Sequence, residues 1–167
     1  GIWMGCTGNY LFRYDFAMKK FRSEKIVAKS AEDVECDLAL HNILPVDGGL
    51  LINGGEGIYH FDATTGKTIL TYQHIQKAGA FCFVKDGQNG YWIGYKANTI
   101  VHLDRNLNET GRYKLGREFN NVEHILPGDS SDVWIALMGG GMAHFYPESG
   151  ILKFYTTSQG LINNTVY

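Results

Sequence analysis

Three kinds of residue in this sequence are of types that carry out chemistry, and each of them recurs or clusters. The histidines recur at intervals of 42 residues: His60, His102 and His144. Imidazoles are common metal ligands, so together they could hold one metal ion. The glycine run 139–141 precedes His144 and could cradle a phosphate. The aspartates recur as well: Asp15, Asp62 and Asp104. Two carboxylates in one cleft are what the hydrolysis of glycosides usually needs.

Whether these residues can meet depends on the elements that hold them, and those elements are repeats. Four segments align: GIWMGCTGNYLFRYD (1–15), GLLINGGEGIYHFD (49–62), GYWIGYKANTIVHLD (90–104) and DVWIALMGGGMAHFY (132–146). Each is an apolar strand, a short polar turn and a second apolar strand. Another strand-like stretch precedes the later three segments, and one follows each segment. One unit is therefore four short strands in about 42 residues, which is typical of a β-propeller blade.

The repeat changes the interpretation of the candidate chemistry. The three histidines occupy the same place in successive sheets, and Arg13 occupies that place in the first. Metal ligands must lie within roughly 3–4 Å of each other, whereas equivalent positions on neighbouring sheets are about 10 Å apart. We therefore expect the histidines to pack between sheets, the glycines to form a hairpin turn and the aspartates to be turn residues. The sequence predicts no catalytic residue, no metal site and no cofactor.

Composition agrees with a chain of many short strands. The chain has 167 residues, of which 44% are hydrophobic and 13% aromatic, with 21 glycines. A net charge of −2 gives no general attraction to nucleic acid or to an anionic membrane, and no run approaches the roughly 18 apolar residues of a membrane span. The cysteines show no CxxC pair: Cys6, Cys36 and Cys82. We expect buried free thiols, with one disulfide and a leftover thiol as the alternative.

The repeats resemble the two-component regulator propeller repeat over nearly the whole chain. The resemblance is carried by NNVEHIL (120–126), YWIG (91–94), VWIA (133–136), EGIYHFD (56–62), GGGMAHFY (139–146) and ILKFYTT (151–157). The tail SQGLINNTVY (158–167) is similar to the phrase that leads into a next innermost strand. Departures are Leu51 in place of tryptophan, Ala136 in place of glycine, Tyr146 in place of aspartate, and a long connector at 23–37.

This resemblance implies a non-catalytic, periplasmic sensor segment of a hybrid two-component system. Members of the family commonly detect oligosaccharides released from polysaccharides, work as homodimers and signal to a histidine kinase. A membrane would be reached only through the rest of the parent chain. Two rival functions stay open: a propeller-type lyase or glycosidase, and a purely structural protein-interaction propeller. Turnover of an oligosaccharide would favour the enzyme, whereas saturable sugar binding without turnover would favour the sensor.

The predicted fold is all-β, a single partial β-propeller over 1–167 with about four four-stranded antiparallel blades. Its parts are blade strands in 1–22, full blades in 38–73, 80–115 and 122–157, and the start of a next blade in 158–167. The chain begins at the second strand of a blade, so we expect an excised piece. It could be half of a seven- or eight-bladed ring with the remaining blades in the parent chain, a small self-closed ring, or a ring completed by a second copy.

Candidate ligand contacts follow from the loops. In propellers, the turn between the second and third strands lies at the same end as the link to the next blade, and ligands approach rigidly held loops there. Aromatic faces can stack on sugars, and amides and charges can bond to hydroxyl groups. The candidate ligand-binding residues at this end are Tyr10, Glu56, Tyr95, Lys96, Asn98, Arg117 and Glu118.

Overall fold

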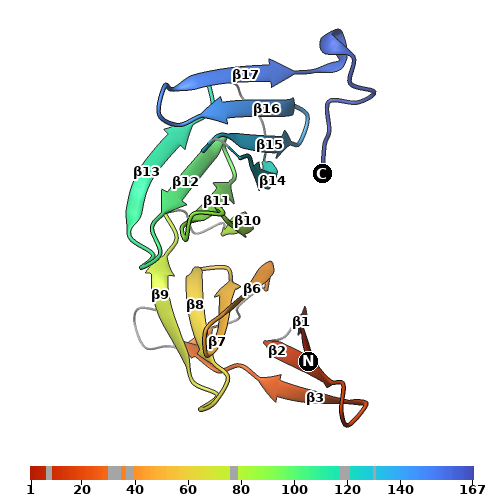
Figure 1. Ribbon diagram of the computed structural model, residues 1–167, viewed down its shortest axis with the longest axis vertical. Helices are drawn as coiled ribbons and strands as arrows, with labels where there is room; N and C mark the ends of the chain where they lie inside the picture. The colour runs from red at the N-terminus through yellow and green to blue at the C-terminus, as the bar shows by residue number, and fades with distance from the viewer. Residues whose placement is uncertain (7–8, 30–34, 37–39, 76–78, 117–120, 130) are drawn as a thin grey trace. The chain divides into compact units, whose positions relative to one another are not determined.

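The computed structural model describes residues 1–6, 9–29, 35–36, 40–75, 79–116, 121–129 and 131–167 (Figure 1). The chain divides into two compact units, Gly1–Gly79 and Ala80–Tyr167, called the first and second units below. The described part is built from strands, and its one helix is the short 3-10 helix η1 (Thr157–Gln159). Within the described ranges, no helix is long and apolar enough to cross a membrane.

The first unit holds a three-stranded sheet, a two-stranded pair and a four-stranded sheet, each antiparallel. The three-stranded sheet has β1 (Ile2–Cys6), β2 (Tyr10–Asp15) and β3 (Lys20–Lys25). The pair is β4 (Ala28–Lys29) and β5 (Glu35–Cys36), within the long connector. The four-stranded sheet has β6 (Asn42–Val46), β7 (Gly49–Asn53), β8 (Gly57–Asp62) and β9 (Thr68–Gln73).

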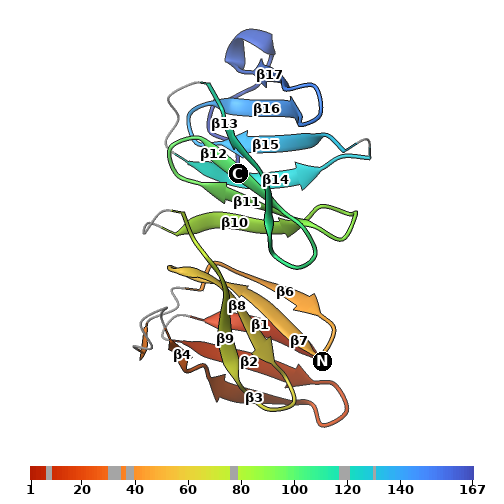
Figure 2. The ribbon, with the colours of Figure 1, turned by 90° about the vertical axis from the view of Figure 1, so that its left-hand side faces the viewer.

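The second unit holds two four-stranded antiparallel sheets whose strands follow the order of the chain (Figure 2). One sheet has β10 (Ala80–Lys85), β11 (Tyr91–Tyr95), β12 (Thr99–Leu103) and β13 (Glu109–Lys114). The other has β14 (Val122–Pro127), β15 (Val133–Leu137), β16 (Gly141–Tyr146) and β17 (Ile151–Tyr155). These are the four-stranded repeats that the sequence predicts. The continuity of both units in one ring stays a prediction.

The strand register confirms the alignment of the repeats. In each sheet, the tryptophan position of one strand, which Leu51 occupies in the second repeat, pairs with the histidine or arginine position of the next strand. The pairs are Trp3 with Arg13, Leu51 with His60, Trp92 with His102 and Trp134 with His144. Because side chains alternate across a strand, this register sends the same repeat positions to the same face of every sheet. The expectation that equivalent residues belong to successive sheets is therefore correct.

Each unit has its own apolar core between its sheets. In the first unit, Leu50, Ile52, Tyr59 and Phe61 of the four-stranded sheet cluster with Leu11 of β2. In the second unit, Trp92 and Ile100 face a cluster that includes the buried side chains of β14–β16. Burial of such side chains is the main favourable term in folding.

The turns behave as the repeat predicts. The Asp62 carboxylate accepts hydrogen bonds from the backbone N–H groups of Thr64 and Thr65, both at 2.8 Å. These bonds, first that of Thr65, lower the pKa of Asp62 below its ordinary value. Asp15 and Asp104 make equivalent bonds to residues two to four positions ahead. In the β15–β16 hairpin, Gly139 and Gly141 have φ angles of 79° and 78°, which glycine adopts without strain.

The cysteines meet the expectation only in part. Cys82 is a buried free thiol, and burial raises its pKa to about 12. Cys6 is also free but is exposed, which corrects the prediction that it is buried. The reason is its place on β1, an edge strand with one largely exposed face. The side chain of Cys36 lies outside the described residues.

The tail after β17 forms no strand in the described structure. Instead, the carbonyl of Asn164 accepts a hydrogen bond from the N–H of Gly141 at 2.6 Å, and the N–H of Val166 donates to the carbonyl of Leu137 at 3.2 Å. The link before β14 is similar, since the carbonyl of Asn121 accepts from the N–H of Met138 at 3.2 Å. The start of a further blade in 158–167 stays a prediction.

Candidate ligand-binding loops and inter-sheet pockets

The turns between second and third strands do lie against the links between sheets, within each unit. In the second unit, Lys96 forms an isolated bridge with Asn121 in the link to β14. In the first unit, the N–H of His74, just after β9, donates to the carbonyl of Glu56 at 2.8 Å. These backbone contacts place the turns and the links at the same end of the sheets within each unit, and ligand binding there stays a prediction.

Three of the candidate side chains reach solvent. Tyr10 is the first residue of β2 and is 41% exposed. Glu56 is exposed in the β7–β8 turn. Lys96 is exposed, and its Nζ lies 5.3 Å from the ring centroid of Phe81, a cation–π distance. Tyr10 and Glu56 belong to the first unit, and Lys96 belongs to the second unit.

The other candidates are not surface groups of the described structure. Tyr95 is fully buried because it is the last residue of β11 and not a turn residue. Asn98 is 6% exposed and has a φ of 63°, and its carbonyl accepts a hydrogen bond from the N–H of Leu115. This differs from the expectation of a sugar contact and indicates a role in shaping the turn. Arg117 and Glu118 lie outside the described residues.

The first unit has a buried polar cluster at its loop end that the sequence pattern does not predict. The Nε2 atom of His74 lies 3.0 Å from Oδ1 of Asn53 and 3.1 Å from the carbonyl of Gly54. Burial lowers the pKa of His74 to about 4, although its bond to Gly54 opposes the shift. His74 is therefore neutral near pH 7 and ties the end of β9 to the end of β7. The repeat pattern does not indicate this cluster, because the position equivalent to His74 in the next repeat is Gly116.

The repeat histidines of the second unit belong to clusters of tryptophan, histidine and aspartate. His102 packs on Trp92, with ring centroids 4.5 Å apart, and its Nε2 lies 2.8 Å from Oδ2 of Asp86. His144 stacks on Trp134 at 3.8 Å, and its Nε2 bonds to Asp132. Burial alone would raise the pKa of Asp86, but the hydrogen bonds from His102 and from two backbone N–H groups outweigh it and lower the pKa.

The first of these clusters has the connectivity of a catalytic relay, because the Oγ1 of Thr110 lies 2.6 Å from Nδ1 of His102. The same hydroxyl is also within 3.2 Å of the carbonyl of His102. In the next sheet, the group near Nδ1 of His144 is instead the phenol of Tyr146, at 3.3 Å. What recurs is only the indole, the imidazole and the carboxylate. The cluster therefore fastens the turn before the second strand to the third strand.

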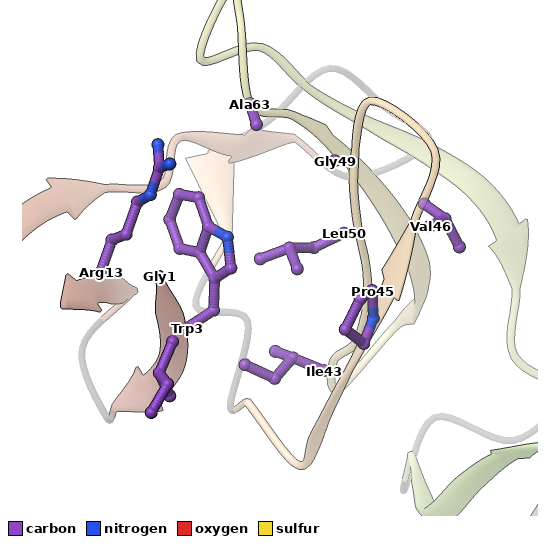
Figure 3. Close-up of a pocket in the computed structure, with 10 residues that line it drawn as sticks. Gly1, Trp3, Arg13, Ile43, Pro45, Val46, Gly49, Leu50 and Ala63 are labelled. Atoms are coloured by element: carbon purple, nitrogen blue, oxygen red, sulfur yellow. The ribbon is translucent and has the colours of Figure 1, made fainter. Parts of the chain in front are cut away.

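Each unit also has a pocket between its sheets, at equivalent positions of the repeat. The first-unit pocket has a volume of about 540 Å³ and is lined by Trp3 and Arg13 from one sheet and Ile43, Pro45 and Leu50 from the other (Figure 3). The second-unit pocket has about 210 Å³. Its lining includes the equivalents of Trp3, Arg13, Pro45, Gly49 and Ala63: Trp92, His102, Pro127, Asp132 and Pro147.

Comparisons with known proteins identify the fold. No family model matches the chain, and no curated protein sequence matches it. Among solved structures, it is similar to the extracellular domain of the one-component system BT4673 from B. thetaiotaomicron, with a TM-score of 0.69 and 14% identity over 98% of this chain and 22% of that chain. The extracellular domain of the hybrid two-component system BT3049 from the same organism gives 0.65 and 18% over 90% and 21%.

A third similar structure is an enzyme, virginiamycin B lyase from Staphylococcus aureus, with a TM-score of 0.67 and 16% identity over 89% of this chain and 49% of that one. The chain folds as part of a β-propeller. The all-β propeller class predicted from the repeats is thus confirmed. The chain spans about a fifth of the two extracellular domains, at 22% and 21% of their lengths. At these identities the similarity establishes the fold, and it agrees with the family that the repeats resemble.

Proposed function

We propose that this propeller segment belongs to the extracytoplasmic sensor region of a hybrid two-component system and is itself non-catalytic. The observation that carries the proposal is its similarity to extracellular domains of two B. thetaiotaomicron signalling systems over 98% and 90% of its length. The repeat motifs support the same assignment independently of the fold. In this proposal the segment is periplasmic, its ligand is an oligosaccharide from polysaccharide breakdown, and the parent protein signals as a homodimer.

Sugar contact is proposed at the loop end of the sheets. In the first unit, the exposed Tyr10 and Glu56 offer an aromatic face and a negative charge, and in the second unit the exposed Lys96 offers a positive charge. Carboxylate and ammonium groups form the stronger hydrogen bonds to hydroxyl groups. Backbone bonds hold the turns that carry Glu56 and Lys96 against the links between sheets. In each unit, a turn held in this way suits binding with little rearrangement and makes no demand for catalytic groups.

The first test measures binding and turnover with one panel of oligosaccharides. Titration calorimetry is expected to find a saturating sugar, and mass spectrometry to recover that sugar unchanged. Replacing Glu56 or Lys96 by alanine is expected to weaken binding by about tenfold, the effect of one charged hydrogen bond. Lys67→Ala, in the β8–β9 turn at the other end of its sheet, is the matched control. Equal affinity in all variants would place the ligand elsewhere, and absence of any bound sugar would count against the sensor.

The second candidate function is that of a lyase, and it is favoured by the similarity to virginiamycin B lyase. Incubation with virginiamycin B and with the oligosaccharides that bind tests it directly. Disappearance of either compound, with a product of altered mass, would establish an enzyme. The sensor proposal expects both compounds to remain intact.

A further inference from the structure

The second-unit pocket lies between two complete sheets, β10–β13 and β14–β17, each with all four of its strands. Its lining comes from the strands and from the turns β10–β11, β14–β15 and β16–β17. Those turns lie at the end of the sheets away from the β11–β12 turn that carries Lys96. The pocket is therefore separate from the loop end at which sugar contact is proposed.

One wall of this pocket is aromatic. Trp92, His102 and Tyr113 follow one another across β11, β12 and β13. The ring centroid of Trp92 lies 4.5 Å from that of His102 and 6.0 Å from that of Tyr113. A Cβ atom added to Gly111, the cross-strand neighbour of His102, would lie 2.5 Å from the phenol oxygen of Tyr113. The phenol therefore occupies the space that a side chain at position 111 would fill, and it extends the aromatic wall.

The charge of the lining is negative. It contains no lysine or arginine, and it contains three carboxylates: Asp86, Asp132 and Glu148. Backbone N–H groups of Gln88 and Gly90 hold the Asp86 carboxylate in place, at 2.6 and 2.7 Å. Glu148 is exposed and forms no ion pair among the described residues. The lining therefore keeps a net negative charge whichever protonation state the His102 imidazole has.

The size and layout of the pocket restrict the kind of cation that fits. Its volume of about 210 Å³ is that of roughly seven water molecules in the liquid. Gln88 and Ser131 close one side, because the Nε2 of Gln88 donates to the Oγ of Ser131 at 3.1 Å and joins two turns. Among the described residues, no group of three or more histidine, cysteine, aspartate or glutamate side chains is arranged to hold a metal ion. A small organic cation fits this arrangement better than an inorganic ion.

We propose that the second-unit pocket binds a small organic ammonium ion. Its charged group lies against the aromatic wall, because ring faces attract cations within about 6 Å of their centroids. The carboxylates of Asp86 and Glu148 balance its charge. Choline-like quaternary ammonium compounds and protonated amino sugars share this chemistry. The equivalent first-unit pocket has Arg13 and no carboxylate in its lining, so the preference for a cation belongs to the second unit.

The first experiment compares choline with neohexyl alcohol, its uncharged carbon analogue, on the 167-residue chain. Calorimetry is expected to show that choline saturates with a Kd at or below about 1 mM. The uncharged analogue is expected to bind at least about tenfold more weakly, because it has the same shape but lacks the charge. NMR locates the ligand, since the side-chain amide of Gln88 and the indole N–H of Trp92 are expected to shift on titration. Equal binding of the two compounds, or shifts confined to residues outside the pocket, would overturn the proposal.

The second experiment removes one carboxylate at a time. Glu148→Gln is expected to weaken choline binding about threefold, the effect of an exposed charge. Asp86→Asn is expected to weaken it about tenfold, with circular dichroism confirming that the variant is folded. Asp47→Asn, an equal charge change in the β6–β7 turn of the first unit, is the matched control and is expected to change nothing. Unaltered affinity in Glu148→Gln, which removes an exposed side chain, would contradict the proposal even if Asp86→Asn failed to fold.

Further ligands distinguish the sources of the cation. Glucosamine, with glucose as its uncharged counterpart, tests amino sugars in the same assay, and saturation by either choline or glucosamine at the pocket supports the shared chemistry. Displacement of choline by an equal concentration of calcium would show that the carboxylates hold an inorganic ion, and the proposal would fail. Lys96→Ala, which tests sugar contact at the loop end, is expected to leave choline binding unchanged. The sensor proposal and this proposal therefore stand or fall separately.

Discussion

The sheets β1–β3 and β10–β13 share one repeat pattern but have different surroundings. Strand β1 of the first sheet, IWMGC, is 5 residues long with four exposed positions, whereas all five residues of β11 are buried. The contrast appears at a shared glycine. A Cβ atom added to Gly94 would lie 2.5 Å from Sγ of Cys82 and from Cγ1 of Val122. One added to Gly5 would have its nearest neighbour at 3.5 Å. The repeat determines where strands and turns occur, while neighbouring strands determine how tightly each position is enclosed.

The largest expected effect separates these two glycines. Gly94→Ala is expected to reduce the free energy of unfolding by about 3 kcal/mol, because the new methyl overlaps β10 and β14 side chains in a filled core. Gly5→Ala is expected to change it by less than about 0.5 kcal/mol. Urea denaturation of both variants measures the difference. Equal losses would show that the two sheets are equally enclosed and would remove the basis of the comparison.

A smaller effect is expected at the position that Arg13 shares with the repeat histidines. Asp132→Ala leaves His144 next to Trp134 without its carboxylate and should cost about 2 kcal/mol of stability. Arg13→Ala removes an exposed side chain with no ion pair among the described residues and should cost less than about 0.5 kcal/mol. If thermal unfolding shows a large loss for Arg13→Ala, then Arg13 already has a structural partner.

The smallest expected effect concerns pH and the first unit. The pKa of His74 is about 4 in the folded chain, below the 6.5 of an unperturbed histidine. The unfolded chain therefore takes up a proton first as pH falls. The stability that neutral His74 contributes is complete above pH 6.5 and is lost between pH 6.5 and about 4. At pH 5 the loss is about 1–2 kcal/mol. An NMR titration of the imidazole checks the midpoint, and a midpoint near 6.5 would contradict the buried environment.

The strands, turns and register of this chain were predictable because they depend on local patterns. Glycines and aspartates mark turns by what their own backbone and side chains do, so Asp62 and Gly139 could be placed without knowing any neighbour. The burial of individual side chains was harder to predict from the sequence. Tyr95 looks like a turn aromatic in the sequence, yet it ends a strand and is fully buried. Cys6 looks like a core thiol, yet its strand is an edge.

The aspartates that bond to the repeat histidines were not predicted, for a different reason. Asp86 lies six residues before Trp92, whereas Asp132 lies two residues before Trp134, so the two aspartates share no spacing in the aligned repeats. Turns of different length bring them to the same place on their histidines. A pattern of fixed spacing cannot detect an equivalence of this kind, which arises only when the turn is folded. The same holds for His74 and Asn53, which are 21 residues apart.

The exposure of Cys6 has a practical consequence. Thiol reagents attack thiolates that solvent can reach, so Cys6 accepts a label under conditions in which Cys82, with its pKa of about 12, does not. Once Cys36 is replaced by serine, a single fluorophore or spin probe can be attached at the end of β1. Such a probe would report on whatever approaches that strand while the second unit remains chemically untouched.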